Sequence, residues 1–393
     1  MDYSDLKKYL KIEGDKKLTN EHAYITHYLQ NSKNGVASIY KKKALEYIAS
    51  RIEKSVDTTW DVPFPPPKKP LFKFIDLFAG IGGFRLALQS LGGKSVFSSE
   101  IDNAAKQTYE SNFGEYPFGD IRDFTGSEIT DRELKKLIPN HDVLAGGFPC
   151  QPFSLAGVSA RNYLDQEHGF LDKNQGNLFF DIARIIDLKK PKIVFLENVK
   201  NFERHDGGNT FTTVKKTMED LGYHFFSKTI NAKSLVPQKR ERFYIVCFKK
   251  KLKYFEFPDL TGDAIPLRSI LEDDVSPEYT ISDRLWEGHI NRTRRNIERG
   301  TGFIANLANL DEPSNTLVAR YGKDGKECLI PQEGMNPRKL TPRECARLQG
   351  FPENYKLPPS NAAAYKQFGN SVAVPVVEKI ASNFIKILLR SKK

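Results

Sequence analysis

Residues 72–83 read FKFIDLFAGIGG, an apolar run that ends in a cluster of glycines. We predict a buried strand over Phe72–Leu77, because strands covered on both faces are apolar almost without interruption. Phe84–Leu91 has helical spacing, and the two glycines that follow it are a common helix end. A strand, a glycine turn and a helix in this order bring backbone N–H groups close to a ligand.

The same alternation of strand and helix continues along the chain. It indicates an α/β fold whose parallel sheet carries helices on both faces. The C-terminal residues have helical spacing, and we find no internal repeat. A further helix is expected at 178–186, and further apolar strands are expected at 95–99, 142–145, 193–196 and 243–248.

Composition narrows the class of protein. Of the 393 residues, 39% are hydrophobic, so the chain can build sizeable cores and is not wholly disordered. Its 60 basic and 49 acidic residues give a net charge of +11, which favours a polyanionic partner. The four cysteines form no CxxC pair, so we expect neither a disulfide framework nor a metal site. With no apolar run near the ~20 residues of a membrane span and no secretory signal, we expect a cytosolic protein without a membrane partner.

The N-terminal part differs in texture from the rest. Residues 1–62 are polar and Lys-rich, with helical spacing over 42–52, which predicts a small helical arm. The alternative is a solvated tail with transient helix. Residues 63–70 are rich in proline and predict an extended linker. Over 261–337 the alternation is lost, which predicts an irregular second lobe.

The glycine turn suits an adenosine ligand. Its spacing is GxGG rather than GxGxxG, so the dinucleotide fingerprint is absent and a nicotinamide-dependent dehydrogenase is nearly excluded. Glu100 follows the next strand, where a carboxylate can accept hydrogen bonds from two ribose hydroxyls. Asp120 could accept one from an adenine amino group. Adenosine without a pyrophosphate fits S-adenosylmethionine, although each carboxylate alone could also be a surface residue or a helix cap.

Cys150 has the setting of a nucleophile. It follows the strand at 142–145, at the sheet edge where loops build a ligand crevice. Pro149 and Pro152 restrain its backbone, and rigid positioning favours attack. The alternative is a small buried hydrophobic residue, which is what we expect of the other three cysteines, Cys247, Cys328 and Cys345.

Charged residues at two other strand ends complete this set. Glu197 follows the strand at 193–196, and Arg240 and Arg242 precede the strand at 243–248. A nucleophile, an acid–base carboxylate and fixed positive charge at one sheet edge make a candidate catalytic centre. Taken alone, the two arginines could instead belong to a charged surface run.

Six segments resemble, in order, the motifs of the DNA (cytosine-5) methyltransferases of bacterial restriction-modification systems: 76–85, 149–151, 197–199, 238–242, 338–350 and 367–372. The resemblance covers about 71–393 and is more specific than any single motif. It implies a Rossmann-like, S-adenosylmethionine-dependent catalytic domain over 71–260, completed by 360–393. A smaller target-recognition domain would occupy 261–359, and the helical arm would precede the linker.

The resemblance also implies a mechanism. Cys150 would attack C6 of a cytosine flipped out of duplex DNA, and Glu197 would hold N3 and the exocyclic amine. Arg242, supported by Arg240, would stabilise the bound base. C5 would then take the methyl group of S-adenosylmethionine, and loss of the C5 proton with elimination of Cys150 would complete the cycle.

A cofactor site is implied in the same way. Phe78 and Ile101 would sandwich the adenine, although many family members carry Trp where Ile101 stands. Glu100 would bind the ribose and Asp120 the amino group. The residues implied for S-adenosylmethionine are Phe78, Gly80, Gly82, Gly83, Glu100, Ile101, Asp120, Ile121, Asn370 and Val372.

Specificity and partners follow as expectations. The loop at 154–176 would be a mobile lid over DNA, and 316–327 resembles the corresponding segment of enzymes that methylate CCNGG-like sites. We expect a monomer that acts on duplex DNA. Two rival interpretations stay open: a tRNA cytosine-5 methyltransferase of the same fold, and a regulator that binds DNA through 1–62.

Overall fold

Contacts within the chain define two compact units. The first comprises Met1–Thr229, Arg242–Pro258 and Glu378–Lys393, and the second comprises Ile230–Glu241 and Asp259–Val377. The domain boundaries expected from the sequence, after 260 and after 359, differ from the changeovers at Pro258 and Val377. The computed structural model describes residues 20–31, 40–41, 43–44, 59–149, 178–300, 305 and 307–390.

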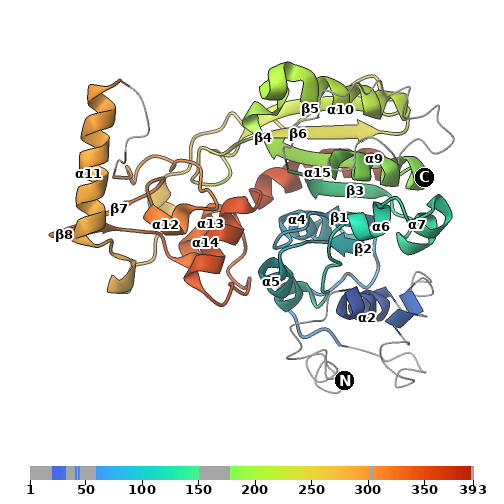
Figure 1. Cartoon of the computed structure of the whole chain (residues 1–393), viewed down its shortest axis with the longest axis horizontal. Coiled ribbons are helices and arrows are strands. Elements are labelled where there is room, and N and C mark those ends of the chain that lie inside the picture. The colour runs from blue at the N-terminus through green and yellow to red at the C-terminus, as the bar shows by residue number, and fades with distance from the viewer. Residues whose placement is uncertain are drawn as a thin grey trace. The chain divides into compact units, whose positions relative to one another are not determined.

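A six-stranded sheet lies at the centre of the first unit, with the strand order β2-β1-β3-β4-β6-β5 (Figure 1). Its strands are β1 (Phe72–Leu77), β2 (Gly93–Ser99), β3 (Val143–Gly147), β4 (Ile193–Val199), β5 (His224–Asn231) and β6 (Glu241–Phe248). The four strands β2, β1, β3 and β4 run parallel to one another, as predicted. The prediction of an all-parallel sheet is wrong for β6, which runs antiparallel to β4. Strand β5 was not predicted.

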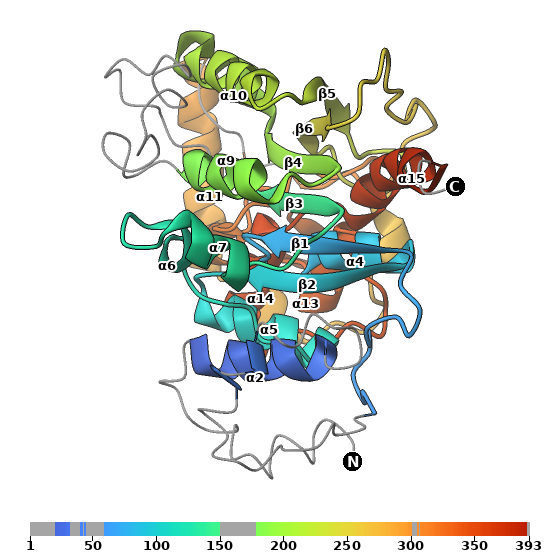
Figure 2. The same cartoon turned by 90° about the vertical axis from the view of Figure 1, so that its right-hand side faces the viewer.

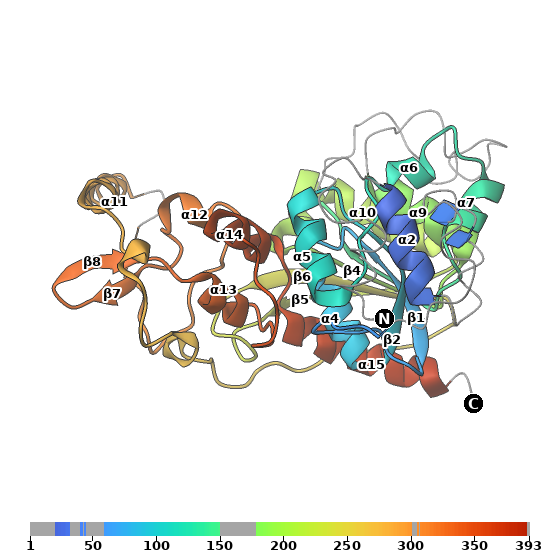
Figure 3. The same cartoon turned by 90° about the horizontal axis from the view of Figure 1, so that it is seen from below.

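Helices cover both faces of this sheet, which confirms the α/β class. Figure 3 shows α9 on one side of the strands and α4 and α15 on the other. Successive side chains of β4 point to opposite faces of the sheet, and each face has its own hydrophobic core. Val194 and Leu196 pack with the residues of α9. On the other face, the ring centroid of Phe195 lies 5.3 Å from that of Phe84 and 5.1 Å from that of Phe384. The helices of this unit after the linker are α4 (Gly83–Ser90), α5 (Asn103–Phe113), α6 (Arg122–Thr125), α7 (Asp131–Leu137), α9 (Leu178–Lys189), the 3₁₀ segment η1 (Lys200–Gly208), α10 (Asn209–Asp220) and α15 (Val374–Arg390), which begins in the second unit.

The second unit contains more regular structure than the sequence predicted. Irregular structure was expected over 261–337, and this is wrong for the helix α11 (Asp283–Glu298). Among the sixteen residues of α11 only His289 is buried, and most of the helix is polar. The remaining elements are η2 (Leu267–Ile270), η3 (Pro277–Tyr279), α12 (Tyr321–Asp324), the antiparallel pair β7 (Ile330–Gln332) and β8 (Met335–Arg338), α13 (Pro342–Leu348) and α14 (Asn361–Asn370).

Part of the N-terminal arm packs into the first unit. The helix α2 (Asn20–Asn31) buries every residue from His22 to Asn31, and Figure 2 shows it beyond the edge strand β2. The Ser98 N–H of β2 donates to His27 Nε2 at 3.2 Å, and the Tyr40 hydroxyl donates to the carbonyl of Val96 at 3.2 Å. These bonds satisfy polar groups that an open sheet edge would expose. The solvated-tail alternative is therefore wrong for α2; the helix expected over 42–52 lies mostly outside the described residues.

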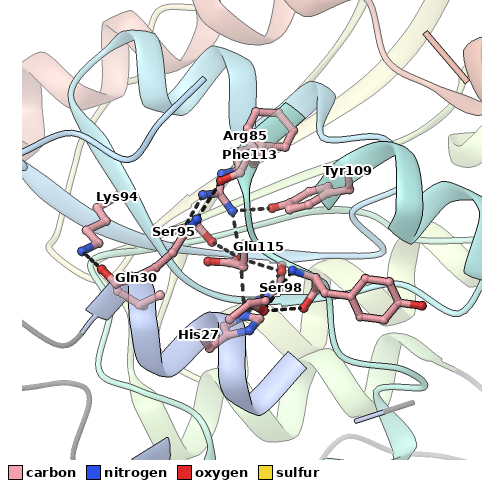
Figure 4. A network of polar contacts seen from close by, with 12 residues as sticks. His27, Gln30, Arg85, Lys94, Ser95, Ser98, Tyr109, Phe113 and Glu115 are labelled. Atoms are coloured by element: carbon pink, nitrogen blue, oxygen red, sulfur yellow. Dashed lines mark hydrogen bonds and ion pairs between the residues drawn. The ribbon is translucent and has the colours of Figure 1, made fainter. Parts of the chain in front are cut away.

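A buried ion pair connects the arm, the sheet and the helix after the glycine turn (Figure 4). Arg85 Nη1 of α4 lies 2.8 Å from Glu115 Oε1, and neither side chain is exposed to solvent. The same guanidinium donates to the hydroxyl of Tyr109 and to Gln30 Oε1 of α2. Burial alone would raise the pKa of Glu115, but the charge of Arg85 and the hydrogen bonds from Arg85 and Ser98 hold it below its usual value. Glu115 is therefore an ionised partner.

We expect Glu115→Gln to lower the free energy of unfolding by about 3–5 kcal/mol, because it leaves the Arg85 charge buried without a counter-charge. Urea unfolding at neutral pH measures this change. The exposed Glu128→Gln serves as a control that changes stability by less than about 0.5 kcal/mol.

The pH dependence of the Glu115 effect has a definite sign. Since the folded-state pKa of Glu115 is lowered, its ionised form stabilises the fold above the unfolded-state pKa of about 4.3. This contribution is lost as the pH falls through the folded-state value. The difference between wild type and Glu115→Gln should therefore shrink below about pH 4.3, and a difference independent of pH would contradict the assignment.

Candidate active site

The glycine turn between β1 and α4 is shaped for close approach. Gly82 has φ 83°, and a Cβ atom there would lie 2.2 Å from Cε2 of Phe113, so no larger residue fits. At Gly80 a Cβ atom would meet nothing within 4 Å, so space is open beside the turn. Of the described side chains, none caps α4, which starts at Gly83. Its first N–H groups can therefore serve an acceptor on a ligand.

Two apolar residues stand at the ends of neighbouring strands. Phe78 follows β1 and has φ 55°, a left-handed conformation that is rare for a bulky residue and typical of functional positions. Ile101 follows β2 and is 68% exposed. The two strands are parallel, with Leu77 opposite Ser99, so both residues emerge at the same sheet edge. Their predicted contact with an adenine ring is compatible with this placement.

Glu100 ties the glycine turn to the next helix. Its Oε2 accepts from Gly80 N–H at 2.8 Å and its Oε1 accepts from Asp102 N–H at 2.8 Å. Burial raises the pKa of this carboxyl group, and the two backbone hydrogen bonds oppose that shift. Both oxygens are therefore fixed beside the turn, where the lone pairs they retain can accept from ribose hydroxyls.

Asp120 lies in a turn that is hydrogen-bonded to the end of β2. The Glu100 N–H donates to the carbonyl of Phe118 at 2.8 Å, which brings the turn at 119–121 to the end of β2. The side chain of Arg122 donates from Nε to both oxygens of Asp120 at 3.0 Å, and this bonding lowers the Asp120 pKa. Arg122 was not predicted as a partner of Asp120, although it stands only two residues after it. Ile121 is buried under the turn.

The groups at this edge fit S-adenosylmethionine. They provide open space at the turn, an uncapped helix start, exposed apolar surface at Ile101 and a fixed carboxylate. Asn370 and Val372 belong to the second unit, where Asn370 is exposed at the end of α14 and Val372 is buried. Eight of the ten implied residues thus share one unit: Phe78, Gly80, Gly82, Gly83, Glu100, Ile101, Asp120 and Ile121.

A second charged centre lies at the end of β4. Arg242 Nε donates to Glu197 Oε1 at 3.1 Å, and both side chains are largely buried. The pair forms because β6 runs antiparallel to β4, so the start of β6 meets the end of β4, with Arg242 opposite Val199. Gly147 stands beside Glu197 in the parallel register, and a Cβ atom there would approach Glu197 Oε2 to 3.1 Å. The glycine therefore makes room for the carboxylate.

The residue after Glu197 holds the segment that leads to Cys150. Asn198 Nδ2 donates to the carbonyl of Phe148 at 2.9 Å, and Asn198 Oδ1 accepts from the Val199 N–H at 2.8 Å. Asn198 is buried, so this anchor is protected from water. Cys150 itself, like the predicted lid at 154–176, lies outside the described residues. Its predicted role therefore remains a prediction.

Arg240 occupies a different setting from Arg242. It is buried in the second unit, where Nη1 donates to the carbonyl of Leu317 at 3.0 Å and Nη2 donates to the carbonyls of Gly369 and Ser371. Nearby, Gln238 Oε1 accepts from the Leu317 N–H at 2.7 Å. Arg240 thus holds the backbone on both sides of Asn370. Gln238 was not expected as a site residue.

The cysteines that the structure describes lie in the protein interior. Cys247, Cys328 and Cys345 are buried, as predicted, and burial raises the pKa of each thiol. Within the described ranges, no three His, Cys, Asp or Glu side chains are grouped to hold a metal ion. Among the described helices, none has the length and apolar character required to cross a bilayer.

Comparison with known proteins agrees with this geometry. The family model for C-5 cytosine-specific DNA methylase matches residues 72–386. The chain is 47% identical over 371 residues to Type II methyltransferase M1.ScrFI of Lactococcus lactis subsp. cremoris, covering 92% of this chain and 91% of that protein. It is also 47% identical over 333 residues to Type II methyltransferase M.SsoII of Shigella sonnei, covering 83% of each.

The fold has solved counterparts. The structure of S. pombe Dnmt2 methyltransferase superimposes with a TM-score of 0.61 at 20% identity, covering 81% of this chain and 99% of that one. This likeness supports the fold, while the family match and the relatives support the activity. The chain therefore belongs to the C-5 cytosine-specific DNA methylases and is a DNA (cytosine-5) methyltransferase that uses S-adenosylmethionine.

Proposed function

We propose that this chain methylates C5 of a cytosine flipped out of duplex DNA, through a covalent bond between Cys150 Sγ and C6. The observation that carries the proposal is the Glu197–Arg242 pair at the end of β4. It lies beside Gly147, three residues before Cys150, and Asn198 holds the Phe148 carbonyl between them. A base must leave the stack to reach such a centre.

Each residue of this centre has a defined task. The Cys150 thiolate donates an electron pair to C6, and electron density moves to C5. Glu197, oriented by Arg242, hydrogen-bonds N3 and the exocyclic amine and so stabilises the charge that the addition creates. S-adenosylmethionine, when bound, supplies an electrophilic methyl group. The C5 proton is then lost and the C6–Sγ bond breaks, which restores the thiolate.

The cofactor would be held by the glycine turn and the ends of β1 and β2. Glu100 accepts from the ribose, Asp120 from the adenine amino group, and Phe78 and Ile101 flank the ring. The N-terminal N–H groups of α4 suit the carboxylate of the methionine part. Asn370 and Val372 complete the set, and Arg240 fixes the carbonyls on either side of Asn370.

The second unit offers a surface for the DNA backbone. The C-terminal half of α11 and the residue that follows it expose four arginines, and Arg292 lies 3.7 Å from Asp324 in a loose ion pair. Such guanidinium groups favour phosphate contacts, which add affinity without sequence preference. Base reading is assigned to 261–337, and to 316–327 for a CCNGG-like target. The four arginines are Arg292, Arg294, Arg295 and Arg299.

The biological role is inferred from relatives. M1.ScrFI and M.SsoII are named type II methyltransferases, which supports a modification enzyme of a restriction-modification system. We infer that it acts as a monomer in the bacterial cytosol. The tRNA alternative is the less favoured, because the family model that matches is one of DNA methylases. Methyl transfer into duplex DNA rather than total tRNA separates the two.

Covalent trapping tests the nucleophile. Wild-type protein incubated with S-adenosylmethionine and duplex DNA containing 5-fluorocytosine should form an adduct that survives denaturing electrophoresis, because fluorine cannot leave as a cation. Cys150→Ser should abolish the adduct and keep DNA binding, and Cys328→Ala should still be trapped. Equal trapping by Cys150→Ser would refute the assignment.

The Glu197–Arg242 pair can be tested separately. Arg242→Lys replaces a planar donor by a point charge, so Glu197 loses its orientation, and kcat should fall about 10²- to 10³-fold. Affinity for S-adenosylhomocysteine, measured by calorimetry, should stay the same. Arg268→Lys, which changes an exposed ion pair, is the matched control and should retain full activity. An unchanged kcat in Arg242→Lys would exclude the pair from the reaction.

Bisulfite sequencing tests the target. DNA from cells that express the protein should carry 5-methylcytosine within CCNGG-like sites, because 316–327 resembles the recognition segment of enzymes with that target. DNA from cells expressing Cys150→Ser should carry none. Methylation confined to another sequence context would contradict the proposed target while leaving the reaction intact.

A further inference from the structure

One residue of the N-terminal arm contacts the turn assigned to the adenine. Asn20, the first described residue of α2, accepts from the Gly119 N–H through Oδ1 at 3.0 Å. Its Nδ2 donates to Asp123 Oδ2 at 3.1 Å. The two bonds lie on either side of Asp120 and Ile121, so a single side chain from the arm bridges the turn.

The helix that carries Asn20 is firmly held. At its far end, Gln30 donates to the carbonyl of Phe113 at 2.7 Å and accepts from Arg85, as Figure 4 shows for the latter contact. In the middle, His27 donates through Nδ1 to its own helix and accepts the Ser98 N–H through Nε2. The helix thus has fixed points on α4, α5 and β2, and Asn20 has a defined position relative to all three.

The same three elements support the cofactor site from behind. Arg85 belongs to the helix that starts at the glycine turn, and Ser98 is two residues before Glu100. Phe113 fills the space behind Gly82. Asn20 reaches around this assembly to the remaining part of the site, the turn at Gly119. The residues that α2 contacts here are not themselves assigned to bind the cofactor. They are Arg85, Ser98, Phe113 and Gly119.

We propose that Asn20 is a positioning residue for S-adenosylmethionine: through it, α2 holds the turn at 119–121 in the conformation that binds the adenine. The inference rests on the proposed location of the cofactor site. Without Asn20, the Gly119 N–H and the Asp123 carboxylate lose a common partner, and the turn must be ordered when the cofactor binds. The arm therefore acts on cofactor affinity and not on the bond-making groups around Glu197.

Binding linkage gives the proposal a second consequence. If docking of α2 favours the bound conformation of the turn, the bound cofactor must favour docking of α2 to the same extent. The amides of 20–31 should then exchange hydrogen more slowly in the presence of S-adenosylhomocysteine. This effect is measurable in the wild-type chain and needs no variant.

The variant experiment uses Asn20→Ala in the full chain, with Glu21→Ala on the same helix as matched control. Calorimetry with S-adenosylhomocysteine should give a Kd raised about three- to tenfold in Asn20→Ala, as expected for the loss of one or two hydrogen bonds. KM for S-adenosylmethionine should rise by a similar factor, while kcat at saturating cofactor and KM for DNA stay within about twofold. Glu21→Ala should bind like wild type.

The outcomes distinguish the inference from the proposed function. If wild type binds S-adenosylhomocysteine and Asn20→Ala matches Glu21→Ala, the positioning role is wrong and the site assignment stands. If Asn20→Ala loses kcat and cofactor affinity alike, with a lowered melting temperature, the residue serves the fold alone. If Glu100→Ala leaves the wild-type Kd unchanged, the proposed site itself is wrong. Absence of slowed exchange over 20–31 would also overturn the inference.

Discussion

The ion pair between Arg85 and Glu115 is the interaction on which the cofactor side of the molecule depends. It joins the helix after the glycine turn to the segment that follows α5, and neither side chain is exposed to solvent. An isolated buried charge costs several kcal/mol, so each partner keeps the other in place. Gln30 adds the N-terminal helix to the same guanidinium. One interaction thereby fixes the relative positions of the turn, the edge strand and the arm.

The catalytic side depends on strand direction. Parallel strands deliver Phe78, Glu100 and Glu197 to one sheet edge, because their carboxyl ends coincide. A fifth parallel strand would place its first residues at the opposite edge. Since β6 is antiparallel, Arg242 at its start reaches the end of β4 and bonds Glu197. The reversal of one strand thus supplies the cation that the candidate centre requires.

Two arginines separated by a single residue make different contacts. Arg242 bonds a carboxylate in the first unit, and Arg240 bonds backbone carbonyls in the second. A guanidinium with five donors can hold several carbonyls together, which lysine cannot do in the same geometry. The chain passes between units at this point, so one short motif serves both. The N-terminal helix also contacts two places, since it covers the edge strand β2 and bonds the turn at Gly119.

The sequence alone determined the α/β class, the positions of five strands, the glycine turn and the residues that stand at the strand ends. These features are local, because apolar runs and glycine spacing report on burial and backbone conformation directly. Strand direction was not legible, since a continuous apolar run reads the same in either direction. The docking of α2 was hidden because its buried surface includes His27 and Gln30, which look like solvent-exposed residues until their partners on distant segments are known. Only the tertiary structure, which brings residue 20 to residue 119, joins the arm to the turn that follows β2.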